Sequence, residues 1–163
     1  MNAAHLHLML NHLPVLGAPF VALLLAWGLF RQQRDLVRAG LGAAVIVAAL
    51  AYPVFLTGEP AEHLVEDSAW FDEHRVHEHE ERAEAGLIAI LITGTVAGFG
   101  LWQSRGGRNV NRLFSGATLA GLVLSAGLFG WAALAGGEIR HDEVRAEAAT
   151  VTPNDGRPDA DHD

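Results

Sequence analysis

The sequence predicts an all-α protein, a bundle of four transmembrane helices. Its charged side chains all fall within four short blocks, at residues 31–38, 59–84, 105–112 and 138–163. The four segments that carry no charge are residues 1–30, 39–58, 85–104 and 113–137. Each segment reaches the length of about 20 apolar residues that a helix needs to cross a bilayer core. The chain is therefore expected to cross a membrane four times.

The signs of the charged blocks predict the orientation of the bundle. The first and third blocks are basic: each has three arginines, and the two blocks together hold one acid, Asp35. The second and fourth hold ten and eight acids against two and three arginines. Because short arginine-rich loops stay in the cytoplasm, both termini and the loop after the second helix should lie on the opposite side, which in a bacterium is the periplasm. The predicted location is the bacterial inner membrane.

The first helix is expected at about residues 3–30. Pro14 and Pro19 each remove a backbone N–H donor and clash with the carbonyl group four residues earlier, so a bend is expected in its outer half. The second helix carries Pro53 one turn before its outer end. Carbonyl groups freed at such bends need buried polar side chains or a cavity, unless the bends are ordinary packing features. Since the N-terminus lacks the basic region and cleavage site of a signal peptide, the first helix should be retained.

A short helix start and a long third helix are expected next. Residues 57–63 indicate a turn and a new helix, with Pro60 at its first position and Glu62 in its first turn. From about Trp70 the pattern is helical without interruption, so the third helix should project from the membrane by about three turns. Glycines in the third and fourth helices allow close contact between helices. They are Gly94, Gly98, Gly100, Gly116, Gly121, Gly127 and Gly130.

Composition narrows the possible functions. The chain has no cysteine, which excludes disulfides, iron–sulfur clusters and thiolate metal sites. Its acidic balance argues against nucleic acid and against anionic lipid at the outer face, and it suits cations. The membrane domain is expected to take residues 1–147, and residues 148–163 should form a disordered acidic tail, since they offer little apolar surface to bury.

Histidines are the candidate ligands, because all nine lie on the outer side or in the outer ends of the helices. His5 and His12 are seven residues apart and share a face of the first helix. His12 is the deeper of the two, where an ionisable side chain is costly unless it is paired, hydrated or bound. A neutral histidine bonded to a freed carbonyl group is the alternative. His7 points away from this face, which indicates an interfacial residue.

The third helix presents two sets of polar residues. His74, His77, Glu78 and Glu81 form one stripe with the spacing of helical metal sites, although a solvated charged face has the same pattern. The face of His79 continues through small residues, which favours an inward position for His79.

At the end of the fourth helix, the face of His141 continues through glycines, and such a groove accepts either another helix or a flat cofactor such as haem. Three helices thus bring histidine to one membrane level. The sequence therefore predicts a transition metal ion, or the iron of haem b, held by His12, His79 and His141, with His5 and Glu62 as further ligands or as partners that orient them. The function expected of such a site is electron transfer or metal handling. No sequence signature supports catalysis.

Several runs also resemble those of a group of uncharacterised bacterial four-span membrane proteins, a domain of unknown function. The runs are HLHLMLNHLPVLG (5–17), TGEPAE (57–62), a His-Glu pair at 77–78 or 79–80, and GGEIRHDE (136–143). The resemblance covers roughly residues 5–143 and implies the fold and the location, but no activity. A competing function is that of a non-catalytic subunit that packs against a larger respiratory or photosynthetic complex through its glycine-rich helices.

Overall fold

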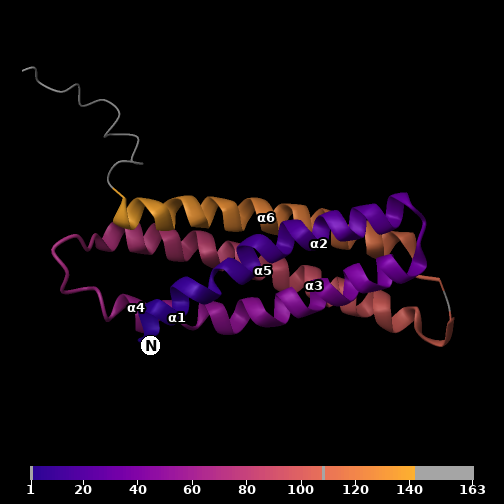
Figure 1. Cartoon of the computed structure of the whole chain (residues 1–163), viewed down its shortest axis with the longest axis horizontal. Helices are drawn as coiled ribbons and strands as arrows, with labels where there is room; N and C mark the ends of the chain where they lie inside the picture. The colour runs from indigo at the N-terminus through magenta and orange to yellow at the C-terminus, as the bar shows by residue number, and fades with distance from the viewer. Residues whose placement is uncertain (1, 108, 142–163) are drawn as a thin grey trace, which may run out of the picture.

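The computed structural model describes residues 2–107 and 109–141, and this part of the chain is built of helices alone (Figure 1). Four helical segments are long and apolar enough to cross a membrane: Ala3–Phe30, Arg34–Phe55, Glu73–Gln103 and Arg112–Arg140. The predicted count of four membrane helices is confirmed. The predicted tail at residues 148–163 lies outside the described residues.

The first segment is interrupted as its prolines predict. Helix α1 spans Ala3–Leu10 and helix α2 spans His12–Phe30, with Asn11 between them. The interruption lies three residues before Pro14, whose ring would clash with the carbonyl group of Leu10 in a continuous helix. Pro19 remains inside α2. The side chain of Asn2 begins α1 by accepting a hydrogen bond of 2.9 Å from the backbone N–H of His5.

Helix α3 spans Arg34–Phe55, and the short helix α4 spans Gly58–Glu62. The sequence placed Pro60 at the first position of this helix, but α4 begins two residues earlier, at Gly58. Pro60 still lies in the first turn, where its missing N–H is not needed. Thr57 does not cap α4, because its hydroxyl donates to the carbonyl group of Val54 at 2.6 Å and so satisfies the end of α3.

Helix α5 spans Glu73–Gln103 and is capped by Asp72, whose side chain accepts from the backbone N–H groups of His74 and Arg75. At 31 residues it is about 46 Å long, which exceeds a hydrocarbon core of about 30 Å by roughly three turns. A short turn, η1 (Arg105–Gly107), leads towards helix α6, which spans Arg112–Arg140. The guanidinium of Arg38 donates to the carbonyl group of Ser104 at 3.0 Å, which satisfies the end of α5.

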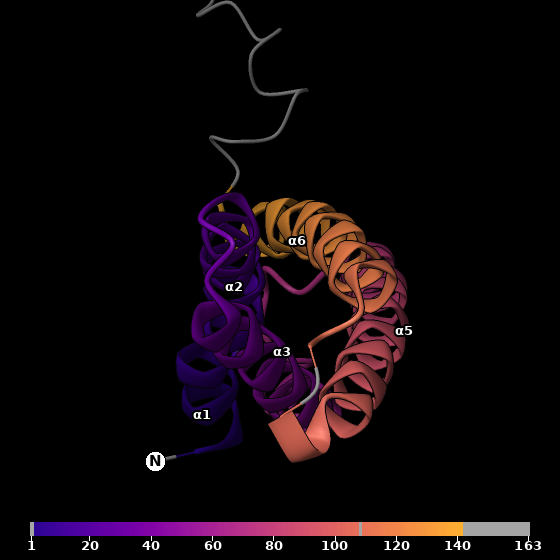
Figure 2. The same ribbon diagram turned by 90° about the vertical axis from the view of Figure 1, so that its right-hand side faces the viewer.

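The long helices form a closed ring in which α2 packs on α3, α3 on α5, α5 on α6 and α6 on α2 (Figures 1 and 2). Glycine allows the closest approaches. Gly94 faces Ala48 of α3, and Gly121 faces Thr93, so that neither position has room for a side chain. We call the end with α1, α4 and the start of α5 the acidic end, and the end with residues 31–33 and 104–111 the arginine end. Helix α6 finishes at the acidic end.

Candidate site at the acidic end

The structure separates the histidines that the sequence grouped. His5 and His12 are exposed on α1 and α2, and His141 is exposed at the end of α6. His79 is partly buried, and so is Glu62 of α4. Within residues 2–107 and 109–141, no three histidine, aspartate or glutamate side chains are grouped closely enough to hold a metal ion. The predicted ligands His12, His79 and His141 are therefore not brought together.

His79 lies at the contact between α5 and α6. Its Nδ1 is 2.9 Å from the carbonyl oxygen of Ala132. The ring lies over Gly136, since a Cβ atom built there would be 3.1 Å from Cε1 and 3.2 Å from Nδ1 of His79. The absence of a side chain at Gly136 therefore makes room for the imidazole.

His7 is also partly buried, at the junction of α3 and α4. Its Nδ1 is 2.9 Å from the hydroxyl oxygen of Thr57, and its ring lies beside Gly58. The sequence placed His7 away from the face of His5 and His12, as an interfacial residue, and the structure places it partly buried against the junction of α3 and α4. His79 lies close enough to His7 for the two imidazoles to interact electrostatically. His7 is thus the histidine that the sequence argument missed.

The hydrogen bonds determine which nitrogen of each imidazole carries the proton. A carbonyl oxygen can only accept, so Nδ1 of His79 must donate to Ala132. Thr57 has a single hydroxyl proton and gives it to Val54, so it can only accept from Nδ1 of His7. In their neutral forms both histidines therefore carry the proton on Nδ1. Nε2 is the nitrogen with a free lone pair.

His12 shows the same proton position in a different setting. Its Nδ1 donates to the carbonyl oxygen of Leu8 at 2.9 Å, one turn earlier in the chain. This bond gives the carbonyl group of Leu8 a partner within the same segment. It matches the alternative stated for His12 in the sequence, a neutral histidine bonded to a carbonyl group.

His7 and His79 lie at one level of the bundle. His7 precedes the end of α2 at Phe30 by 23 residues, and His79 precedes the end of α5 at Gln103 by 24 residues. At about 1.5 Å per residue, each count corresponds to about 35 Å of helix, and the count for His7 includes the interruption at Asn11. A hydrocarbon core of about 30 Å that began at the arginine end would be shorter than either length.

A pair of carboxylates lies beside this level. Glu62 of α4 is close to Glu80 of α5, the residue that follows His79. Partial burial and the Glu80 carboxylate raise the pKa of Glu62 above its usual value. Next to it, Nδ1 of His63 is 3.2 Å from the carboxylate of Glu66, and this hydrogen bond raises the pKa of His63. The short α4 segment therefore carries two groups that hold protons more tightly than usual.

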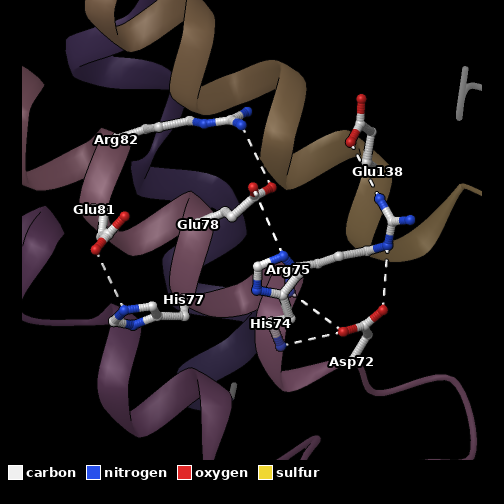
Figure 3. Close-up of polar contacts among 8 residues, drawn as sticks. All are labelled: Asp72, His74, Arg75, His77, Glu78, Glu81, Arg82 and Glu138. Atoms are coloured by element: carbon white, nitrogen blue, oxygen red, sulfur yellow. Dashed lines mark hydrogen bonds and ion pairs between the residues drawn. The ribbon is translucent and has the colours of Figure 1, made fainter.

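The stripe of histidine and glutamate on α5 is engaged in ion pairs along the helix (Figure 3). His77 lies 3.4 Å from Glu81, and His74 lies 3.9 Å from Glu78, with both histidines mostly exposed. Arg75 joins the two helices, because it pairs with Asp72 and with Glu138 of α6, each at 3.3 Å (Figure 3). This part of α5 therefore has the geometry of a solvated charged face.

The glycines that follow the His141 face do not form an internal pocket. A Cβ atom built at Gly127, Gly130 or Gly137 would have no atom of the described chain within 4 Å. These glycines are therefore not covered by another helix of the bundle. The predicted groove therefore lies on the outer surface of α6 and not between two helices of the described bundle.

Comparison with known proteins gave no match: no family model, no curated protein and no solved structure matches this chain.

Proposed function

We propose that this chain is a bacterial inner-membrane protein that binds a transition metal ion at its acidic end, through Nε2 of His7 and Nε2 of His79. One observation carries the proposal. Both imidazoles have Nδ1 held by an oxygen that can only accept, so that each presents an unprotonated Nε2. Histidines that bind metals usually donate their other ring N–H in this way, which fixes the ring and its proton.

The chemistry of the surroundings favours a cation. Glu62 and Glu80 lie at the same end, and the block at residues 59–84 has ten acids against two arginines. Such a field concentrates cations at the site. Imidazole nitrogen with carboxylate or water oxygen suits zinc, iron, manganese or copper.

Two imidazoles leave coordination positions open for water or for a carboxylate, and an open site exchanges its ion. Metal handling therefore fits this arrangement better than electron transfer. We propose a bare ion and not haem b, because the predicted ligands His12, His79 and His141 are not brought together within the described residues.

The proposal includes an orientation and a family. The arginine end faces the cytoplasm because it carries the two basic blocks, and the acidic end with the extension of α5 faces the periplasm. The motifs TGEPAE and GGEIRHDE support membership of the four-span family of unknown function.

Metal analysis of the full chain purified in detergent tests the proposal. His7→Ala and His79→Ala should each lower the content of bound metal by more than half, because each removes one of two protein ligands. His74→Ala is the matched control, since this exposed histidine of α5 lies on the charged stripe and should keep the wild-type content. A wild-type protein without metal, or equal content in all variants, would overturn the proposal. A haem absorption band in the wild type would show that the bound group is haem b and not a bare ion.

A second function has its own observation in the uncovered glycines of α6. Gly116, Gly127 and Gly130 have open space where a side chain would be, and such positions accept a helix of another protein. The chain would then be an accessory subunit of a larger respiratory or photosynthetic complex. Migration of the chain with a larger assembly in mildly solubilised membranes, together with absence of bound metal, would favour this function.

A further inference from the structure

A shallow hollow of about 220 Å³ lies on the outside of the α5–α6 pair and is separate from the His7–His79 pair. Its lining residues are Glu78, Glu81, Arg82 and Trp131. The guanidinium of Arg82 lies over the ring of Trp131, 4.6 Å from its centre. Its Nη2 is also 3.4 Å from a carboxylate oxygen of Glu78, a contact that Figure 3 shows. The hollow therefore combines one cation, two anions and an aromatic ring.

The hollow lies at the edge of the hydrocarbon layer. Arg82 precedes Gln103 by 21 residues, and Trp131 follows Arg112 by 19 residues. These separations place them about 32 Å and about 29 Å from the arginine end, next to the boundary of a core of about 30 Å. Tryptophan prefers this level, and long arginine side chains reach towards it. The molecules that meet the hollow in a bilayer are phospholipid headgroups.

The charges of the hollow select among headgroups. A phosphate pairs well with the guanidinium of Arg82. A headgroup with a net negative charge and no ammonium, such as glycerol phosphate, would also meet the carboxylates of Glu78 and Glu81, which repel it. A zwitterionic headgroup brings an ammonium group for these carboxylates and a phosphate for Arg82, so that both charges of the headgroup meet a group of opposite sign.

The aromatic ring and the carboxylates distinguish between two zwitterionic headgroups. A primary ammonium has three N–H donors for the carboxylates, whereas a quaternary ammonium has none and depends on an aromatic face. In this hollow, the guanidinium of Arg82 already covers the face of Trp131. We propose that the hollow binds the ethanolamine headgroup of a phospholipid, with its phosphate on Arg82 and its ammonium on Glu78 and Glu81.

Lipid retention after reconstitution tests this site. The full chain is placed in nanodiscs with equal parts of ethanolamine, choline and glycerol phospholipids, extracted with mild detergent, and analysed for bound lipid by native mass spectrometry. The wild type should retain the ethanolamine lipid about threefold over each of the others, the size expected for partly exposed charge pairs. Glu81→Gln and the double variant Glu78→Gln/Glu81→Gln should lose this preference stepwise.

Glu84→Gln is the matched control, because Glu84 is exposed on the same helix and does not line the hollow. It should keep the wild-type preference. Equal retention of the three lipids by the wild type, preference for the glycerol or choline lipid, or an unchanged preference in Glu81→Gln would overturn the proposal. Glu81 is mostly exposed, so its single variant keeps the fold if the double variant does not.

Discussion

At the scale of single residues, the site depends on hydrogen bonds that fix two protons. Thr57 is central, because it accepts from His7 while it donates to Val54. Without that acceptor, the proton of His7 could sit on either nitrogen, and the ring would be free to turn. The contact thus converts an ordinary interfacial histidine into one with a defined Nε2 lone pair.

Replacing Thr57 by valine tests this role, since valine keeps the shape and removes the hydroxyl. Thr57→Val should weaken metal binding by about tenfold, the lower end of the effect of losing a residue that orients a metal ligand. Titration calorimetry with the bound ion measures it. Thr95→Val removes an exposed hydroxyl that bonds only to Leu91 of its own helix, and it should bind as the wild type does. An unaltered affinity in Thr57→Val would contradict the orientation by Thr57.

Gly136 and Gly137 form a natural matched pair for testing the position of His79. A methyl group at Gly136 would press on the His79 ring and weaken its bond to Ala132, whereas one at Gly137 meets open space. Alanine gains about 1 kcal/mol of helix propensity at either position, and a lost hydrogen bond costs about the same. The free energy of unfolding, measured from unfolding curves in detergent, should therefore be about 1 kcal/mol higher for Gly137→Ala than for Gly136→Ala. Metal content should fall in Gly136→Ala alone. Equal behaviour of both variants would contradict the contact.

At the scale of helices, the sequence predicts the elements well, because charge blocks and prolines mark their ends. The interruption at Asn11 follows from Pro14, and the long α5 follows from its uninterrupted pattern. The face that α1 turns inward could not be predicted. Helix α1 has no buried residue, and its contact with α4 decides that His7, and not His5 or His12, faces Thr57.

The glycines of α6 show a second limit of prediction. Gly121 packs against Thr93, yet Gly127 and Gly130 meet no other helix of the described bundle. Lipid is as apolar as a helix surface, so periodicity cannot distinguish a glycine that faces a helix from one that faces lipid. His79 could be placed at a helix contact from its sequence neighbours because Gly86, two turns further along α5, packs against Phe129.

Helix α4 should loosen as the pH rises. Glu62 and His63 both have a raised pKa in the folded chain, so each contributes stability that is complete below its usual pKa, 4.5 and 6.5, and is lost as the pH rises through the folded value. Glu62 is only partly buried, so solvent keeps the effect small. After correction for intrinsic rates, the amides of residues 58–66 should exchange hydrogen faster at pH 7 than at pH 5.

Glu62→Gln should reduce this difference, because it removes the charge that faces Glu80 and protects α4 at pH 7. Glu59→Gln, on the same short helix and exposed, is the control and should keep most of the wild-type difference. The same pH dependence in Glu62→Gln as in the wild type would show that the carboxylate pair does not govern α4.

At the scale of the whole molecule, the closed ring of α2, α3, α5 and α6 separates two chemically different ends. The arginine end ties α3 to the end of α5 through Arg38 and Ser104. The acidic end ties α5 to α6 through Arg75, His79 and Arg82, and gathers carboxylates around the histidine pair. On the proposed function, a cation that arrives from the acidic side would meet an attractive field before it meets His7 and His79.

The orientation of this field decides which compartment supplies the ion. Arginine-rich short loops are retained in the cytoplasm, and the first and third blocks together carry six arginines and one acid. Fusions of alkaline phosphatase after residue 70 and at the C-terminus should be active, because this enzyme folds in the oxidising periplasm. Fusions of green fluorescent protein at residues 33 and 107 should fluoresce. The reverse pattern would place the His7–His79 pair in the cytoplasm and contradict the proposed capture of a periplasmic ion, while the ring of four helices would stand unchanged.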